Sequence, residues 1–442
     1  MIPAEVGLRA IPFCGDCLRC DLRSPTLFYP NLMFEDELAE PNGHLPLKAR
    51  SLIAELSPVM GLLSSVDEQA ATGNQSDATR DVVLMPEGAL PTGIPPALRH
   101  LRFVSVAAAR AHEFAGFDFV PWGWSESAIR VGRTLNLLLD PPDPAVVKHV
   151  NSREFLSAFD RIRDVSDGGG AESPGGVLCR SAVDVAAALD SFARHGSTGW
   201  VIKANFSQAS RNRLLGNGLK PDSSQTNWLQ RRIENNEPVY AEPWCERVAE
   251  SGLQFWIPPL ADASQSVRFE GACEMLTDAF GRYRGSIVTG RVSTESVWWQ
   301  AAISRCQAIA EQSRLLGFSG AMGMDCMLFR SPEDGSLRLR FCHDINGRLT
   351  MGRVALSLRS WLHPGETGFW CHASAESAID WQNVSGDLNM SGVRIVPTSP
   401  SLIGPQSPNL QTVFLISADC ECLIRVARKI LSQDIRGPSQ VH

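Results

Sequence analysis

The stretch Gly317–Arg353, GFSGAMGMDCMLFRSPEDGSLRLRFCHDINGRLTMGR, predicts two β-strands joined by a turn. Its first half contains the apolar run MGMDCMLFR, which carries one acid, Asp325. SPEDGS has the residue types of a turn, and LRLRFCHDIN alternates apolar and polar residues at period two. The second strand ends with Asp344, Asn346 and Arg348. The pattern therefore predicts a hairpin that carries acids, an amide and a guanidinium.

The polar side chains of this hairpin suit a metal and a phosphate. On adjacent antiparallel strands, side chains that point to the same face lie within a few ångströms of each other. Asp325, Asp344 and Asn346 would then offer a hard oxygen set suited to Mg²⁺, with Arg348 beside them for phosphate. An ordinary hairpin whose acids face water has the same spacing, so the hairpin alone leaves both interpretations open.

The composition indicates a globular chain of two or three domains. It has 442 residues, of which 44% are hydrophobic and 20% are charged. The sequence has no apolar run of about 18 residues and no signal-peptide pattern at its start. The net charge of −7 does not favour nucleic-acid binding. We therefore expect a cytoplasmic protein with neither a membrane nor a nucleic acid as partner, and a homodimer stays open as its assembly state.

The segment 1–24 carries three close cysteines, Cys14, Cys17 and Cys20, spaced as C-x₂-C-x₂-C. With a fourth ligand, for which His44 is the nearest candidate, they would hold zinc or an iron–sulfur cluster. A loop of reduced thiols near solvent is the alternative. The other cysteines are scattered singly, which is typical of reduced intracellular thiols that fill core space.

Residues 25–140 alternate short apolar strands with helical segments, which predicts a small α/β domain with a parallel sheet. TLFY, DVVLM, LRFVSV and DFVP are the expected strands, and the alanine-rich VAAARAHEFAG is an expected helix. Ser125 is placed to cap a further helix. Trp122 and Trp124 stand at the turn before it, where they would either line a cleft or pack a domain interface.

Lys203 is the only one of the five lysines that lies within a clear β-run, GWVIKA. The residues that follow it, Asn205–Arg213, form a loop of small polar residues and arginine, which is the candidate lid over the site. A strand lysine commonly lies at a sheet edge and faces water. The alternative is an inward lysine beside a phosphate-binding loop.

Two further apolar strands, EPVYAEPW and ESGLQFWI, follow this loop. They are predicted to flank an acidic turn that holds Glu242, Glu246 and Glu250. After them, residues 266–292 read as an antiparallel meander, and SVWWQAAISRCQAIAEQSRLLG predicts a long helix that ends at Gly317.

The strand lysine, the acidic pair of strands and the hairpin ending in DINGR occur in an order that resembles the ATP-grasp superfamily of carboxylate–amine ligases. The resemblance covers roughly residues 140–435. It implies an α/β (α+β) chain in which a Rossmann-like domain, 25–140, precedes a two-lobed ATP-grasp fold with antiparallel sheets. The implied small lobe, 141–240, carries the phosphate loop, and the implied large lobe, 241–442, carries the Mg–ATP site.

The resemblance implies nucleotide contacts for side chains on the two apolar strands and near the lysine: Arg153, Lys203, Ser207, Glu242, Pro243, Trp244 and either Glu246 or Glu250. Within this set, Lys203 would contact the α- and β-phosphates, and Glu242 with its neighbours would recognise adenine. The resemblance implies catalytic roles for Lys203 and for Arg348, which would steady the transferred phosphate. Arg291 is a third catalytic candidate that would hold the substrate carboxylate or the γ-phosphate, and a solvated strand face is the alternative for it. The resemblance also implies that one or two Mg²⁺ ions, with Mn²⁺ as an alternative, are held by Asp325, Asp344 and Asn346.

The implied activity is the ATP-dependent joining of a carboxylate to an amine, on a small metabolite or peptide, through an acyl phosphate. The sequence identifies neither substrate. It has Asp344 where the family usually has a glutamate, and no glycine stands between Lys203 and Gly216. These two differences also fit the alternative, a catalytically inactive relative that binds nucleotide as a regulatory or interaction module.

Overall fold

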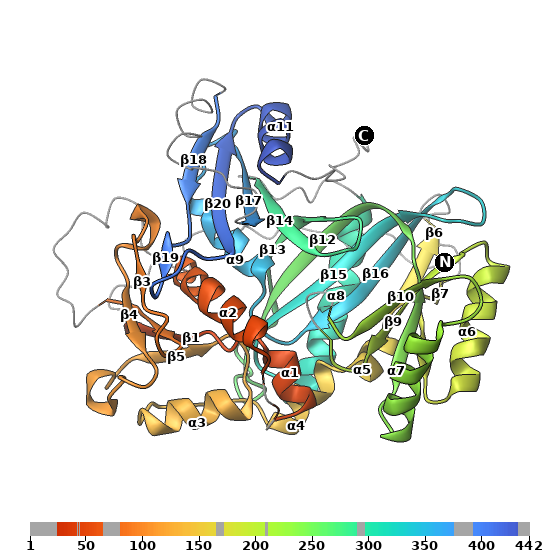
Figure 1. Ribbon diagram of the computed structural model, residues 1–442, viewed down its shortest axis with the longest axis horizontal. Helices are drawn as coiled ribbons and strands as arrows, with labels where there is room; N and C mark the ends of the chain where they lie inside the picture. Colours follow the sequence, from red (N-terminus) through yellow and green to blue (C-terminus); the bar gives the residue numbers. More distant parts are fainter. Residues whose placement is uncertain are drawn as a thin grey trace.

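The structure is a computed structural model that describes residues 24–64 except 42 and 44, and then 80–164, 172–207, 211–289, 297–374 and 392–431. In these residues the chain folds into a four-stranded parallel sheet, a four-stranded antiparallel sheet and a ten-stranded sheet (Figure 1). None of the helices in these ranges has the length and apolar composition needed to cross a lipid bilayer.

The N-terminal unit is built on parallel strands in the order β4-β2-β1-β5. Its elements are β1 (Thr26–Tyr29), α1 (Phe34–Ala39), α2 (Leu47–Leu56), η1 (Ser57–Leu63), β2 (Val82–Met85), η4 (Pro96–Leu98), β4 (Arg102–Ser105), η5 (Ala111–Glu113), β5 (Asp118–Pro121) and α3 (Glu126–Thr134). The predicted parallel sheet is confirmed, and so is the cap of α3, because the Ser125 hydroxyl accepts a hydrogen bond from the Ala128 amide at 3.3 Å.

The predicted alanine-rich helix between β4 and β5 is wrong. Only the short 3₁₀ helix η5 forms there, within a run of turns. Helix propensity alone does not stabilise a short helix, which needs an apolar stripe to bury. In this segment Phe114 and Phe117 instead pack edge to face at 5.5 Å under the sheet, and this packing favours a compact turn.

The middle of the chain forms an antiparallel sheet in the order β10-β9-β11-β8, with α6 and α7 packed beside it (Figure 1). The elements of this region are α4 (Pro144–Val150), α5 (Arg153–Ser157), β8 (Val177–Cys179), α6 (Ala182–Arg194), β9 (Gly199–Ala204), β10 (Arg213–Asn217), α7 (Ser223–Glu234) and β11 (Val239–Pro243). Strand β9 lies between β10 and β11, so its lysine is not on an edge strand.

The ten-stranded sheet has the order β18-β20-β17-β14-β13-β12-β15-β16-β6-β7. Its elements and their helices are β6 (Arg161–Asp164), β7 (Ser173–Pro174), β12 (Glu246–Ile257), β13 (Arg268–Thr277), β14 (Tyr283–Thr289), α8 (Val297–Leu315), β15 (Gly320–Arg330), β16 (Leu337–Asn346), α9 (Met351–Ser357), η6 (Leu358–Trp361), β17 (Thr367–Ser374), β18 (Arg394–Pro397), β20 (Leu410–Ser417) and α11 (Cys420–Leu431). The predicted hairpin, meander and long helix are confirmed as β15–β16, β13–β14 and α8.

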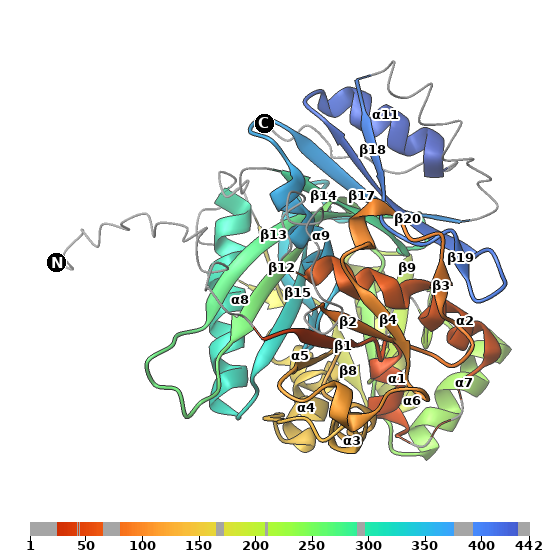
Figure 2. The ribbon, with the colours of Figure 1, turned by 90° about the vertical axis from the view of Figure 1, so that its left-hand side faces the viewer.

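A strand ladder and a shared apolar core are among the contacts that join the N-terminal unit to the rest of the chain. A short ladder pairs β3 (Pro91–Thr92) with β19 (Leu402–Ile403). The main apolar core also runs across the boundary, because Phe34 and Met60 belong to the same buried cluster as residues of β12, β15 and β16. Figure 2 shows α1 and α2 lying against the same body as these strands. Side chains of α1 are thereby brought to the base of the hairpin.

Candidate functional site

The base of the β15–β16 hairpin brings the predicted metal set together. Asp325 pairs directly with Asp344, and Gly323 pairs with Asn346. On its other side Asp325 pairs with Gly252 of β12. Because Gly252 has no side chain, the space beside the Asp325 carboxylate stays open on that flank; a Cβ atom there would lie 3.6 Å from Asp325 Oδ1.

Asp325 is the uncompensated acid of this group. Among the residues that the structure describes, it makes no hydrogen bond and no ion pair. Burial and then the negative charge of Asp344 raise the pKa of the Asp325 carboxyl to about 7. A carboxylate in this setting favours a bound cation, which would lower the electrostatic cost of its negative charge.

Asp344, in contrast, is fully paired with Arg153. Arg153 Nη2 donates to Asp344 Oδ2 at 3.0 Å, and Nη1 donates to Oδ1. Burial raises the pKa of Asp344, but the Arg153 charge outweighs burial and holds that pKa below its ordinary value. Arg153 lies in the first turn of α5, whose N-cap Ser152 accepts a hydrogen bond from the Phe155 amide at 3.1 Å. The bidentate pair therefore depends on a helix start 191 residues away in the chain.

Lys203 points inward from β9 and meets Glu242 of the neighbouring strand. Its Nζ atom lies 2.5 Å from Glu242 Oε1, and its side chain is 12% exposed. Burial lowers the pKa of the Lys203 ammonium, and the charge of Glu242 opposes that shift. The expectation that Glu242, Glu246 and Glu250 sit in an acidic turn is wrong. Glu242 lies in β11, which extends through Pro243, and the other two lie in β12, which begins at Glu246.

A buried network that the sequence interpretation missed holds Glu242 in place. Arg340 of β16, which is 2% exposed, donates to Glu242 Oε2 and, through Nε, to Asp160 Oδ1 at 2.7 Å. The Tyr240 hydroxyl donates to Asp160 Oδ2 at 2.6 Å. Arg340 and Lys203 hold the pKa of Glu242 below its ordinary value despite burial, which raises it. The period-two pattern LRLRFCHD places Arg340 on the same strand face as Asp344. This alternation could have indicated from the sequence that Arg340 belongs to the site.

A second cluster surrounds Glu250 on β12. Glu250 Oε1 lies 3.1 Å from His343 Nε2, and Oε2 accepts hydrogen bonds from Arg247 Nη1 at 3.2 Å and from the Thr277 hydroxyl at 3.4 Å. Burial raises the pKa of Glu250, but His343 and Arg247 outweigh it and lower the value to about 2. Of the two acids between which the sequence did not decide, Glu250 is buried here and Glu246 is exposed.

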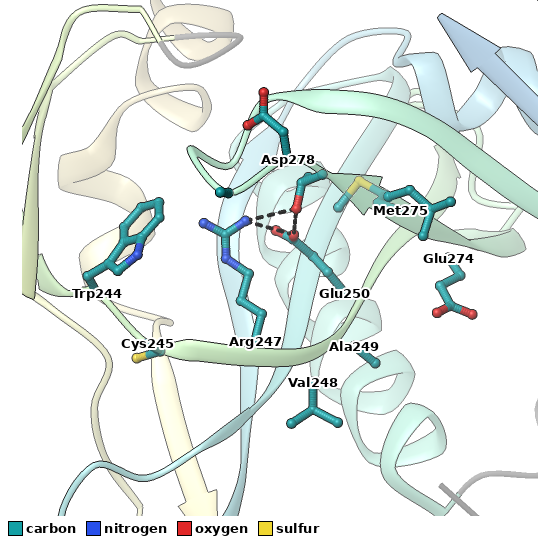
Figure 3. Close-up of a pocket in the computed structure, with 12 residues that line it drawn as sticks. Trp244, Cys245, Arg247, Val248, Ala249, Glu250, Glu274, Met275 and Asp278 are labelled. Carbon is teal, nitrogen blue, oxygen red and sulfur yellow. Dashed lines mark hydrogen bonds and ion pairs between the residues drawn. The ribbon is translucent and has the colours of Figure 1, made fainter. Parts of the chain in front are cut away.

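A pocket lies beside Glu250, between the start of β12 and the end of β13 (Figure 3). Trp244, Arg247 and Glu250 line one side, and Thr277 and Asp278 line the other. The guanidinium carbon of Arg247 lies 4.8 Å from the centre of the Trp244 ring. The pocket therefore offers an aromatic ring, a cation and a buried carboxylate, which suit a planar heterocycle with hydroxyl groups attached.

Arg348 joins the hairpin to the N-terminal unit. Its Nη2 donates to Asn346 Oδ1 at 3.0 Å, and its Nε donates to Glu35 Oε1 of α1 at 2.5 Å. Its guanidinium carbon lies 5.7 Å from the centre of the Trp122 ring. Trp122 thus packs at the interface between the units. Glu35 was missed, because in the sequence FEDEL reads as an ordinary acidic helix start.

Three further residues were predicted to belong to the site, namely Ser207, Pro243 and Arg291. Ser207 contacts Arg153 through its carbonyl and hydroxyl oxygens, both 3.3 Å from Nη2. Pro243 ends β11 beside Trp244. Arg291 lies outside the described residues.

The cysteines of segment 1–24 and His44 also lie outside the described residues. Within the described part of the chain, no group of three or more His, Cys, Asp or Glu side chains is arranged to hold a metal ion. The hairpin set differs from such a group, because its oxygens come from two carboxylates, Asp325 and Asp344, and one amide, Asn346. Its oxygens fit Mg²⁺, which is commonly bound by one or two carboxylates together with substrate phosphates.

No family model matches the sequence, and no curated protein matches it. Solved structures do resemble the fold. N5-carboxyaminoimidazole synthetase from Staphylococcus aureus aligns with a TM-score of 0.50 at 12% identity, covering 85% of this chain and 95% of that one. Pyruvate carboxylase from Rhizobium etli aligns with a TM-score of 0.50 at 12% identity, covering 87% of this chain and 37% of that one. At these identities the likeness shows the fold alone.

Proposed function

We propose that this chain, which has the ATP-grasp fold, is an ATP- and Mg²⁺-dependent ligase that joins a carboxylate to an amine through an acyl phosphate. One observation carries the proposal. The register pair Asp325–Asp344 lies where three cationic side chains from separate parts of the chain converge, namely Arg153, Lys203 and Arg348. A bound metal triphosphate requires that combination of acids and cations.

The cations would serve the first chemical step. When a substrate carboxylate attacks the γ-phosphorus, negative charge approaches negative charge. A bound Mg²⁺ would offset part of that repulsion, held at the Asp325, Asp344 and Asn346 edge of the hairpin. Lys203 and Arg348 would neutralise the phosphate oxygens, and both are already oriented by buried acids, Glu242 and Glu35. Orientation before binding lowers the reorganisation that the reaction requires.

The nucleoside end of ATP would occupy the pocket shown in Figure 3. Trp244 offers a ring face for adenine, and Glu250 offers carboxylate oxygens for ribose hydroxyls. The synthetase and the carboxylase that share the fold are named for reactions at a carboxyl or carboxyamino group. Their names support a substrate class that contains a carboxylate and an amine, in keeping with the chemistry proposed for this chain.

A second candidate is a catalytically inactive chain that binds nucleotide as a regulatory or interaction module. The observation that favours it is the internal pairing of the phosphate-site cations: Arg153 with Asp344, Lys203 with Glu242. In such a chain the Lys203–Glu242 pair would persist when nucleotide binds, and Lys203 would not contact the phosphates. Nucleotide would then raise the thermal stability of the chain without being consumed.

The deciding experiment is a metabolite screen that measures ADP release with Mg²⁺ present. A ligase releases ADP only when both its carboxylate and its amine are supplied. Asp325→Asn should abolish that release while the fold is retained. The matched control is Asp334→Asn, which changes an exposed turn acid paired with Arg338. Nucleotide-dependent stabilisation with no ADP release for any acceptor pair would favour the second candidate. Full ADP release by Asp325→Asn would show that the metal assignment is wrong.

A further inference from the structure

The two acids of the hairpin differ in how much room they leave for a metal ion. Both carboxylate oxygens of Asp344 accept hydrogen bonds from the fork of one arginine, Arg153. This bidentate arrangement uses the planar guanidinium geometry that matches a carboxylate. Each oxygen of Asp344 keeps a further lone pair, but the guanidinium neutralises the carboxylate, so a metal ion bound there would lie against a like positive charge.

Arg153 is held in place by more than Asp344. Its Nη2 also donates to the carbonyl and hydroxyl oxygens of Ser207, each at 3.3 Å. Its backbone amide donates to the Asn205 carbonyl at 3.0 Å. The residue is 4% exposed, so displacement would leave a guanidinium in a site with little water. The arginine is thus part of the wall of the site.

Asp325 differs from Asp344 in its lack of a direct partner. It has no hydrogen bond and no ion pair in the described residues, and its flank opens over Gly252. Asn346, the third predicted ligand, accepts one hydrogen bond from Arg348 and retains a lone pair on Oδ1. Asp325 and the nucleotide phosphates can together hold one ion, because Mg²⁺ commonly uses one or two carboxylates with phosphates and water.

We infer that the hairpin holds a single divalent cation, at Asp325, and that the Arg153 guanidinium takes the place of a second cation at Asp344. The inference rests on the proposed function, since it assumes that a metal nucleotide binds here. It assigns the two acids different roles. Asp325 binds the ion, and Asp344 orients a permanent positive charge toward the phosphates.

The test measures how many metal ions the chain binds for each bound nucleotide. The full-length chain, in excess over a non-hydrolysable ATP analogue in which nitrogen bridges the β- and γ-phosphorus atoms, is dialysed against Mn²⁺. Electron paramagnetic resonance then measures bound Mn²⁺ per bound nucleotide. The native chain should bind one ion, and Arg153→Met should bind two, because Asp344 then loses the positive charge that compensates it. Two ions on the native chain, or one on Arg153→Met, would overturn the inference.

Further variants keep the test decisive. Arg153→Gln, which also removes the charge, gives the same expected count of two if Arg153→Met does not fold. Arg180→Met, which removes an exposed arginine paired with Glu154, should leave the count at one. Asp325→Asn in the native background should weaken the affinity of the nucleotide complex for Mn²⁺ by about tenfold or more, because the phosphates then hold the ion without the carboxylate. Unchanged affinity would show that Asp325 is not the ligand. Failure of the native chain to bind the nucleotide at all would contradict the proposed function instead.

Discussion

Two groups of charged side chains lie close together on the β15–β16 hairpin, one around Arg340 and one at the Asp325–Asp344 pair, and they are arranged in opposite ways. Around Arg340, every charge has a partner: Asp160 and Glu242 accept from the guanidinium, and Lys203 pairs with the second oxygen of Glu242. At the hairpin base, Asp325 has none among the described residues. A charge group that is complete within the chain serves structure and orientation. An incomplete one requires a ligand, which makes it the better indicator of a binding site.

The largest expected effect is the loss of activity when Asp325, the acid without a partner, is replaced. Asp325→Asn should lower ADP release with the accepted substrates by at least about a hundredfold, because it removes the carboxylate that binds the ion. Initial rates at saturating ATP and Mg²⁺ measure this. If the rate falls less than tenfold while the fold is intact, the incomplete group is not the metal site.

A substitution in the fully paired group around Arg340 should lower the free energy of unfolding. Arg340→Met leaves the carboxylates of Asp160 and Glu242 less compensated in the core, so it should lower the free energy of unfolding by about 3–5 kcal/mol. Urea unfolding of both chains measures this. Arg268→Met, which removes an arginine paired with Glu270 at an exposed site, is the control and should cost less than about 1 kcal/mol. Equal losses for the two variants would remove the distinction between the groups.

The pH dependence of stability should also separate the groups. The folded state raises the pKa of Asp325 to about 7, so its contribution is fully present below the unfolded value and is lost as pH rises through about 7. Without metal or nucleotide, the native chain should lose on the order of 2 kcal/mol relative to Asp325→Asn between pH 4 and pH 8, after allowance for solvent screening.

Unfolding midpoints of the two chains across this pH range measure the difference. Saturating Mn²⁺ with the ATP analogue should remove it, because the ion then compensates the charge. Parallel profiles for the native chain and Asp325→Asn without ligand would contradict the assignment of an unpaired carboxylate.

The smallest expected effect is at Gly252. In Gly252→Ala the new methyl would lie 3.4 Å from Gln254 Nε2 and 3.6 Å from Asp325 Oδ1, which are ordinary contact distances. Stability should change by less than about 1 kcal/mol. The methyl partly fills the open flank of Asp325, so the affinity for Mn²⁺ with the ATP analogue should fall a few-fold by titration calorimetry. Unchanged affinity would place the ion on the other flank.

Much of the local structure could be predicted because it follows short-range pattern. The hairpin, the strand around Lys203 and the long helix before the hairpin were all readable from periodicity and turn residues. The helix predicted for the alanine-rich segment after β4 does not form, because helix propensity without an apolar stripe to bury does not stabilise a helix. Glu242 was predicted to lie in an acidic turn between two strands, yet the pairing of β11 with β9 continues through Pro243.

The sequence alone therefore determined which side chains stand on the hairpin, because strand alternation sets the face of each residue. It did not determine which of the two acids is free. That was decided by Arg153, which is 191 residues from Asp344, as Glu35, 313 residues from Arg348, decided how that arginine is held. Pairings over such separations depend on how the units pack, and local periodicity carries no information about them. The difference between Asp325 and Asp344 is a property of the tertiary structure.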